Sequence, residues 1–143
     1  MPDPITPRTG LFAGAEISAS ALSAERLRMT AATENLANAN NSMRLGDGLP
    51  YKRQRVVFET VLDQAGQDTG QVAARLIQDP RYQVRHDPGD PNADAKGNVT
   101  LPDISPILEL TDLMVASKAY EANSNALRGF LRMHENALRI GQA

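Results

Sequence analysis

A helical repeat that fills the last quarter of the chain limits the possible folds more than any other sequence feature. From Ser105 to Leu138, apolar and small side chains recur at spacings of three and four residues, and only Gly129 interrupts the run. This period is that of an amphipathic α-helix, and Ser105 followed by Pro106 is a favourable N-cap and first helical position. Such a helix spans about 50 Å, whereas a compact domain of 143 residues is about 37 Å across. We therefore predict a helix, residues 105–143, that is too long for a single globule.

A second helix is predicted near the other end of the chain, over residues 11–41. Residues 12–40 contain no proline, and Leu22, Met29 and Leu36 are seven residues apart, which places them on one face of a helix. The segment ends in an asparagine-rich run, and asparagine accepts the left-handed backbone conformation that terminates helices.

These two helices carry few large apolar side chains. The chain has 20 alanines, three phenylalanines, three tyrosines and no tryptophan. Burial of a leucine or phenylalanine contributes about 1.5–3 kcal/mol, and an alanine methyl contributes only a fraction of that. Alanine and serine do let helix backbones approach closely. We infer that the two helices need further helices around them.

The middle of the chain, residues 42–104, holds most of the glycine and proline. Short β-prone runs lie between its turn signals, at Tyr51–Leu62, Val72–Ile77, Tyr82–Arg85 and Val99–Leu101. We predict a small, twisted, antiparallel set of strands there and a disordered, proline-rich leader over residues 1–10. The fold class is then mainly α with a small β insertion (α+β).

Composition excludes several classes of function. The net charge is −2 and no basic stripe is present, which argues against nucleic acid and against an anionic membrane surface. There is no cysteine, so neither a disulfide nor a cysteine metal site can form. The first residues do not resemble a cleaved secretory signal, and no apolar run is long enough to span a bilayer. We expect no cofactor, no metal and no membrane insertion.

The segment from His86 to Gly97 is the part of the chain that most resembles a chemical site. Asp90, Asn92 and Asp94 have the spacing of the first calcium ligands of an EF-hand loop, but Ala95 replaces the required glycine and Leu101 replaces the closing glutamate. Aspartate, proline, asparagine and glycine are also the residues that build turns. We interpret the segment as a turn loop, and a metal-assisted hydrolase as the minor alternative.

Two polar groups on the predicted helices have competing interpretations. Asp103, Glu109 and Asp112 lie near a helix N-terminus, where acidic residues offset the macrodipole, and this is favoured over an acid–base pair. Asn35 and Asn38 share one helical face. Their amides either terminate the helix or form hydrogen bonds with a neighbouring chain or with the returning C-terminal helix, and spacing alone does not decide between these.

Ordered motifs carry a resemblance to flagellar axial proteins, the family of rod, hook and hook-associated subunits. The N-terminal signature is Ile17–Met29 followed by Glu34-Asn-Leu-Ala-Asn-Ala-Asn40. Within the family, the chain is most similar to proximal-rod proteins of the basal body. That similarity rests on Pro50–Arg53, Tyr82–Asp94, Gly97–Val99, Leu101–Ile104, Glu109–Met114, Ala116–Asn123 and Leu138–Gln142.

The resemblance implies terminal helices packed antiparallel, export through the flagellar type III apparatus without a cleaved signal, and a place in the rod that crosses the periplasm. The implied partners are other rod proteins, copies of the chain and the export apparatus. We expect the assembly interface to include, from the N-terminal helix, Ile17, Leu22, Leu27, Met29, Asn35, Leu36 and Asn38. From the C-terminal helix we expect Leu110, Leu113, Met114, Tyr120, Asn123, Leu127 and Leu131.

The chain departs from the family pattern at Asn41, Asp90, Asn98 and Asp103, where Thr, His, Tyr and Asn are usual. We expect these changes to tune contacts with neighbours. The leading function is a structural subunit that assembles helically and transmits torque. The alternative is a soluble coiled-coil adaptor that forms a discrete small oligomer from the same helical faces.

Overall fold

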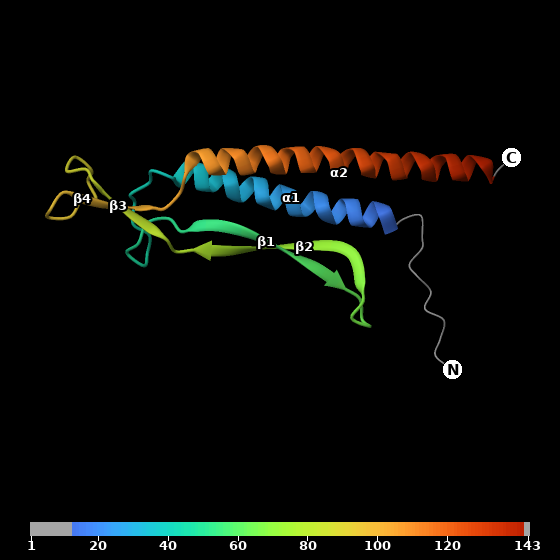
Figure 1. Ribbon diagram of the computed structural model, residues 1–143, viewed down its shortest axis with the longest axis horizontal. Helices are drawn as coiled ribbons and strands as arrows, with labels where there is room; N and C mark the ends of the chain where they lie inside the picture. The colour runs from blue at the N-terminus through green and yellow to red at the C-terminus, as the bar shows by residue number, and fades with distance from the viewer. Residues whose placement is uncertain (1–12, 142–143) are drawn as a thin grey trace.

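In the computed structural model, which describes residues 13–141, two long helices run antiparallel along most of the length of the molecule (Figure 1). Helix α1 is Ala13–Asn38 and helix α2 is Pro106–Ile140. All four strands lie between them in the sequence. The mainly α fold with a small antiparallel β insertion is therefore confirmed.

The strands form two separate hairpins rather than one set. Strands β1 (Arg53–Leu62) and β2 (Asp68–Asp79) make the longer hairpin, and β3 (Tyr82–His86) and β4 (Asn98–Pro102) make the shorter one. Gly66, in the turn of the longer hairpin, and Gly70, near the start of β2, have φ values of +76° and +74°, a region that favours glycine. The sequence located all four strands but predicted β2 four residues too short at its start.

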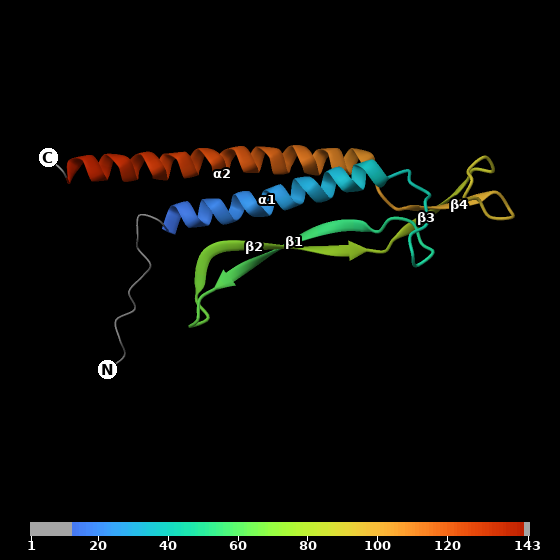
Figure 2. The same cartoon turned by 180° about the vertical axis from the view of Figure 1, so that it is seen from behind.

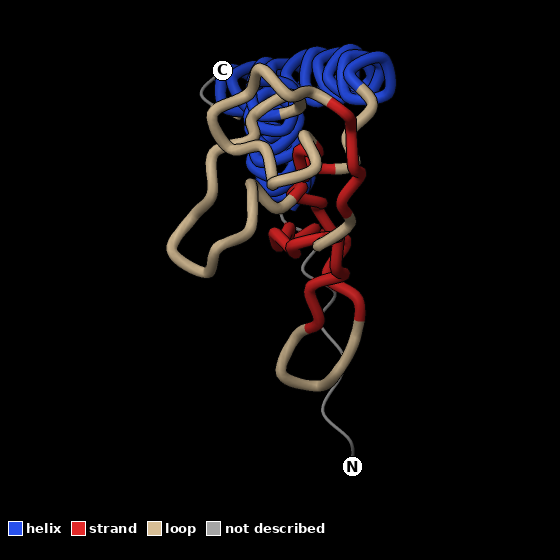
Figure 3. Tube along the Cα trace, turned by 90° about the vertical axis from the view of Figure 1, so that its left-hand side faces the viewer, coloured by secondary structure: helices blue, strands red, loops and turns tan. Residues whose placement is uncertain are grey.

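Helix α1 lies in the middle of three layers, between α2 on one side and the β1–β2 hairpin on the other (Figures 1 and 2). The end-on view shows the same stacking, with the hairpin extending away from both helices (Figure 3). Because α1 is covered on two sides, it buries small residues on both. Its buried residues are Ser18, Ala24, Ala31, Ala32 and Asn35.

The two helices approach closely and end at different levels. A Cβ placed on Gly14 would lie 2.5 Å from the ring of Phe130, so the first turn of α1 packs directly against α2 at this point. Helix α2 continues past the start of α1 (Figure 1). We call residues 131–140 of α2 the overhang.

The buried core is thin. Its large members, Val99, Leu101 and Ile104, lie in β4 and just after it, and most of the other buried apolar residues are alanines. The predicted scarcity of large buried side chains therefore holds for the helical layers. Among residues 13–141, neither helix is both long and apolar enough to cross a membrane.

The described helices begin and end close to the predicted residues. Ser105 occupies the predicted N-cap position of α2 but its side chain makes no cap hydrogen bond. The predicted leader, residues 1–10, lies outside the described residues, as do the outermost residues of both predicted helical segments.

Candidate assembly interface

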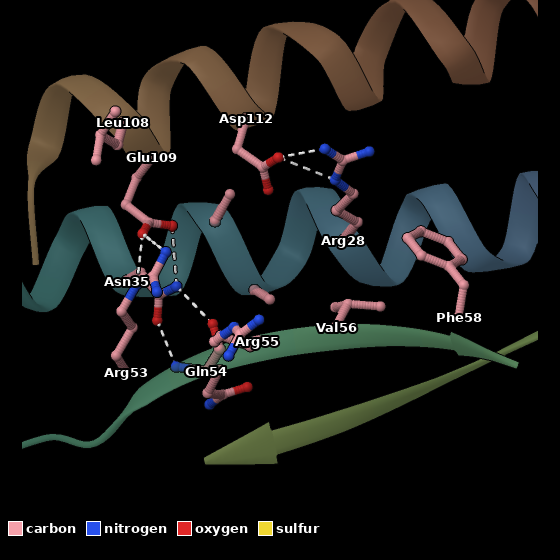
Figure 4. A pocket seen from close by; sticks show the side chains of 12 residues that line it. Arg28, Asn35, Arg53, Gln54, Arg55, Val56, Phe58, Leu108, Glu109 and Asp112 are labelled. Atoms are coloured by element: carbon pink, nitrogen blue, oxygen red, sulfur yellow. Dashed lines mark hydrogen bonds and ion pairs between the residues drawn. The ribbon is translucent and has the colours of Figure 1, made fainter. Parts of the chain in front are cut away.

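A groove of about 390 Å³ opens where α1, α2 and β1 meet (Figure 4). Ala31 and Ala32 of α1 line it, together with Val56 and Phe58 of β1 and Leu108 of α2. Charged side chains from all three elements surround these apolar residues. The groove therefore lies between the three layers, at the end of the helix pair that is nearest the β3–β4 hairpin (Figure 1).

Asn35 is the centre of a buried hydrogen-bond network beside this groove. Only 1% of its surface is exposed. Its Nδ2 donates to the Gln54 carbonyl at 2.8 Å and to Glu109 Oε2 at 3.0 Å. Its Oδ1 accepts from the Gln54 backbone N–H at 2.8 Å and from the Tyr51 hydroxyl at 3.0 Å. One amide thus joins α1, α2 and β1.

The structure gives Asn35 and Asn38 different roles, one for each of the two interpretations left open by their spacing. Asn35 hydrogen-bonds the returning C-terminal helix, through Glu109. Asn38 instead donates to the Glu34 carbonyl of its own helix at 2.8 Å and accepts from Asn41. Asn35 therefore holds the subunit together, whereas Asn38 ends α1.

Glu109 lies in the first turn of α2, as predicted, and is also a buried ion-pair partner. It is 2% exposed, and its Oε1 accepts from Arg53 Nε at 2.7 Å and lies 2.6 Å from Arg53 Nη2. A buried carboxylate needs such a partner because burial removes its hydration. Glu109 therefore pairs with Arg53 of β1 in addition to lying where an acidic side chain offsets the helix macrodipole.

Asp112, one turn further along α2, is paired in the same way with α1. Arg28 donates two hydrogen bonds to Asp112 Oδ1, and the bond to Asp112 raises the pKa of Arg28 above its ordinary value. Two carboxylates predicted to offset a macrodipole are therefore the α2 ends of two ion pairs that cross between elements (Figure 4).

The predicted interface residues of α1 are mostly covered by the subunit itself. Asn35 is buried and Ile17 is 37% exposed; the others are half-buried, and these are Leu22, Leu27, Met29, Leu36 and Asn38. Ile17 packs near Gly70, where an added Cβ would lie 2.9 Å from Ile17 Cδ1. Much of the predicted α1 face therefore contributes to the packing of one subunit.

The predicted interface residues of α2 divide into two groups. Leu113, Tyr120, Asn123 and Leu127 are half-buried and share the face of α2 that includes the buried Ala116. Leu110, Met114 and Leu131 each expose half or more of their surface. The second group has the geometry of a surface available to another chain, since nothing within the described residues covers it.

Several exposed apolar residues of α2 were not among the predicted interface residues. Together with Leu110 and Met114 they form what we call the N-terminal patch, which consists of Ile107, Leu108, Leu110, Met114 and Val115. The overhang adds four more, Leu131, Met133, Leu138 and Ile140, and each of these nine residues exposes half or more of its surface. A signal was present in the sequence, since Leu108 and Val115 are seven residues apart, as are Met133 and Ile140.

The aspartate-rich loop uses its carboxylates to build turns. Asp90 Oδ1 accepts from the Asn92 backbone N–H at 2.8 Å and from the Ser42 hydroxyl at 3.0 Å. Asp94 Oδ1 accepts from the N–H groups of Lys96 and Asn98 at 2.8 and 2.9 Å. These backbone hydrogen bonds lower the pKa of both carboxyls. Across residues 13–141, no cluster of three or more His, Asp or Glu side chains has the geometry to hold a metal ion.

Three of the four departures from the family pattern make contacts inside the subunit. Asn41 Oδ1 accepts from the Met43 backbone N–H at 3.0 Å, and Asp90 Oδ1 accepts from the Ser42 hydroxyl. Asn98 Oδ1 lies 3.2 Å from His86 Nδ1. Asp103 is exposed.

Comparison with known proteins gives a consistent result. The family described as “Flagellar basal body rod FlgEFG protein C-terminal” matches residues 95–140. The flagellar basal-body rod protein FlgC of Yersinia enterocolitica is 39% identical over 129 residues, which is 89% of this chain and 95% of that protein. FlgC of Aquifex aeolicus is 38% identical, covering 81% of this chain and 86% of that protein. FlgC of Bacillus subtilis is 32% identical, covering 92% and 98%.

Proposed function

The chain belongs to the FlgC family of flagellar basal-body rod proteins, and on this premise we propose how its surfaces serve the rod. It is a structural subunit of the basal-body rod, where it assembles with other flagellar components. We propose that it occupies the proximal rod, packs helically with other rod proteins and with copies of itself, and transmits torque through helix contacts. Family membership favours this role over a soluble coiled-coil adaptor.

One observation carries the proposal. Nine large apolar side chains on α2 expose half or more of their surface. Five of them form the N-terminal patch, and an exposed apolar patch on a soluble protein often marks an interaction site. A helix that packs one face on α1 and leaves other faces apolar fits a subunit whose remaining surface is covered in an assembly.

The charged groups of the groove support a mechanical role and not a catalytic one. Arg53 is paired with Glu109 and Arg28 with Asp112. A general acid or base needs a group that can exchange a proton with a substrate, whereas these groups are engaged with one another across three structural elements. We propose that they keep the layers in register when the subunit is under load.

We also propose that the chain is exported through the flagellar type III apparatus, without a cleaved signal, to a rod that crosses the periplasm. The resemblance of the N-terminal motifs to flagellar axial proteins supports this route. Mass spectrometry of the protein recovered from purified basal bodies checks it. An intact N-terminal peptide is expected, and removal of an N-terminal segment would contradict this part of the proposal.

The assembly role is tested by variants of the exposed face that spare the fold. In a strain lacking the gene, we expect the double variant Leu110→Asp, Met114→Asp to restore neither swimming nor rod assembly, because a buried carboxylate cannot be accommodated in an apolar contact. The control, Lys118→Ala, changes an exposed residue of the same helix and should restore both. Far-UV circular dichroism of the purified variants should match that of the unmodified chain. Full motility of the double variant would count against the proposal.

A further inference from the structure

The register between β1 and β2 shifts close to the start of β2. Thr60 is paired with Val72, whereas the next pair along is Leu62 with Asp68. The residues of β2 between these two pairs form what we call the bulge, which consists of Thr69, Gly70 and Gln71. A bulge bends its strand and interrupts the ladder of hydrogen bonds. Strand β2 curves strongly at this end, and the hairpin turn points away from both helices (Figures 1 and 3).

The hairpin itself specifies the shape of the bulge. Gly70 has a φ of +74°, a backbone region that favours glycine, and its N–H donates to Asp68 Oδ1 at 2.7 Å. The Thr69 hydroxyl donates to the Val61 carbonyl at 2.6 Å. The same hydroxyl oxygen accepts from the Gln71 N–H at 3.3 Å. The bulge is therefore held in one conformation by hydrogen bonds that do not involve the helices.

Two residues of the bulge contact neighbouring residues near the start of α1. Gln71 Nε2 donates to Glu16 Oε2 at 3.1 Å. Gly70 packs against Ile17, since an added Cβ would lie 2.9 Å from Ile17 Cδ1. The bend in β2 thus brings its backbone against the first turns of α1.

Ser20, one turn further along α1, provides a third contact. Its hydroxyl oxygen accepts from the Val72 backbone N–H at 3.1 Å. The hydroxyl proton is donated to the Ile17 carbonyl of the same helix at 2.7 Å, and this bond orients the oxygen toward the strand. A backbone N–H at the edge of the bulge is thereby paired with a helix side chain.

The two ends of the hairpin are held on α1 unequally. At one end, Asn35 is 1% exposed and bonds both the N–H and the carbonyl of Gln54; we call this the Asn35 junction. At the bulge, one of the two hydrogen bonds to α1 is exposed and the other is only partly buried. Local opening begins where buried contacts are fewest. The bulge should therefore separate from α1 before the Asn35 junction does.

We propose that the bulge is a releasable latch for the outer half of the β1–β2 hairpin, residues 59–73. When closed, it fixes the direction in which the hairpin turn projects from the helix pair. When open, the outer half moves relative to the inner half, which the Asn35 junction continues to hold on α1. Gly14 packs against Phe130 of α2, so the start of α1 keeps its place while the latch is open. Every contact of the latch lies within one subunit, so the latch is separate from the assembly role proposed above.

Hydrogen exchange of single backbone amides, measured by NMR on the purified full chain, tests the proposal. We expect Ser20→Ala to raise exchange rates several-fold in the outer half of the hairpin, because the Val72 N–H loses its acceptor. Rates in the inner half, residues 53–57 and 75–79, should stay unchanged. The matched control is Ser23→Ala, which alters an exposed serine of the same helix and should change neither half.

A second variant tests the latch from the strand side. Gly70→Ala both strains the bulge and places a methyl against Ile17, so it should also raise exchange in the outer half several-fold. Its control is Gly66→Ala, which has a similar φ of +76° but meets no atom within 4 Å. Gly66→Ala should have a several-fold smaller effect.

Three results would overturn the proposal. Unchanged rates in the outer half of Ser20→Ala would mean that the hydroxyl does not hold the strand. An equal rise in both halves would mean that the whole subunit opens rather than the outer hairpin. Controls that match their paired variants would mean that the contacts with α1 are not what keeps the outer half closed.

Discussion

Arg53 of β1 and Glu109 of α2 form a buried ion pair, with Arg53 Nε 2.7 Å from Glu109 Oε1. The pair connects two elements separated by 56 positions in the chain. Only 3% of the Glu109 side chain is exposed, against 24% for Arg53. The β1–β2 hairpin is thereby fixed to the outer helix as well as to α1, on which it packs.

Removing this carboxylate should destabilise the subunit strongly. We expect Glu109→Ala to lower the free energy of unfolding by about 3 kcal/mol, because it leaves Arg53 without its buried partner and removes one of the two acceptors of the Asn35 amide. Urea denaturation followed by far-UV circular dichroism measures the change. The control Glu121→Ala removes an exposed i,i+3 partner of Lys118 and should cost no more than about 0.5 kcal/mol. Equal effects would contradict the assigned role of Glu109.

Asn35 provides a second test of the same junction between layers. Asn35→Ala removes hydrogen-bond partners from the Tyr51 hydroxyl, the Gln54 backbone and Glu109, and we expect a loss of about 2–3 kcal/mol. Asn38→Ala, four residues from the Glu34 carbonyl that its side chain contacts, should cost less than about 1 kcal/mol. The same denaturation experiment compares them, and a larger loss at Asn38 would refute the division of roles between the two amides.

The close approach of the helices predicts opposite effects at two glycines. Gly14→Ala places a methyl 2.5 Å from the Phe130 ring, and overpacking should outweigh the gain in helix propensity by about 1 kcal/mol. Gly129→Ala meets no atom within 4 Å and should stabilise α2 by up to about 1 kcal/mol. Thermal unfolding of both variants, and of Gly14→Ala combined with Phe130→Leu, checks this. Rescue is expected in the double variant, and its absence would argue against the contact.

The raised pKa of Tyr51 predicts that the protein loses stability in alkaline solution. Burial, followed by the nearby Glu34 charge, raises its pKa to about 12, above the ordinary value near 10. The folded protein therefore holds the phenolic proton more tightly than the unfolded chain does. The associated stability is fully present below pH of about 10 and is lost as pH rises toward about 12. Lys52, whose pKa is raised by Asp47, contributes in the same direction.

Tyr51→Phe separates these two contributions. The variant loses the hydrogen bond to Asn35, so it should be less stable at neutral pH, but its stability should fall less steeply with alkaline pH. Urea midpoints measured from pH 8 to 12 provide the comparison. Identical slopes for the variant and the unmodified chain would show that Tyr51 does not titrate as its surroundings imply.

Local sequence patterns were sufficient to predict the two helices, the four strands and the turn loop around Asp90. Helical period, caps and turn residues act over a few positions, so one sequence displays them. The Arg53–Glu109 pair was missed because it joins two segments that lie 56 residues apart in the chain, and Glu109 near a helix start has an adequate local explanation. The face of α2 that packs on α1 was only partly predicted, since it includes Ala116 and Asn123 beside the larger Leu113 and Leu127. Small and polar residues identify a face only once the neighbouring helix is known.

Tracing this chain in a cryo-electron microscopy map of the intact basal body tests the account most directly. We predict that the α1–α2 pair lies in the wall of the rod, with Ile107, Leu110 and Met114 in contact with a neighbouring subunit. Rod density that cannot accommodate this chain, or a traced subunit whose residues 107–115 face solvent, would contradict the account.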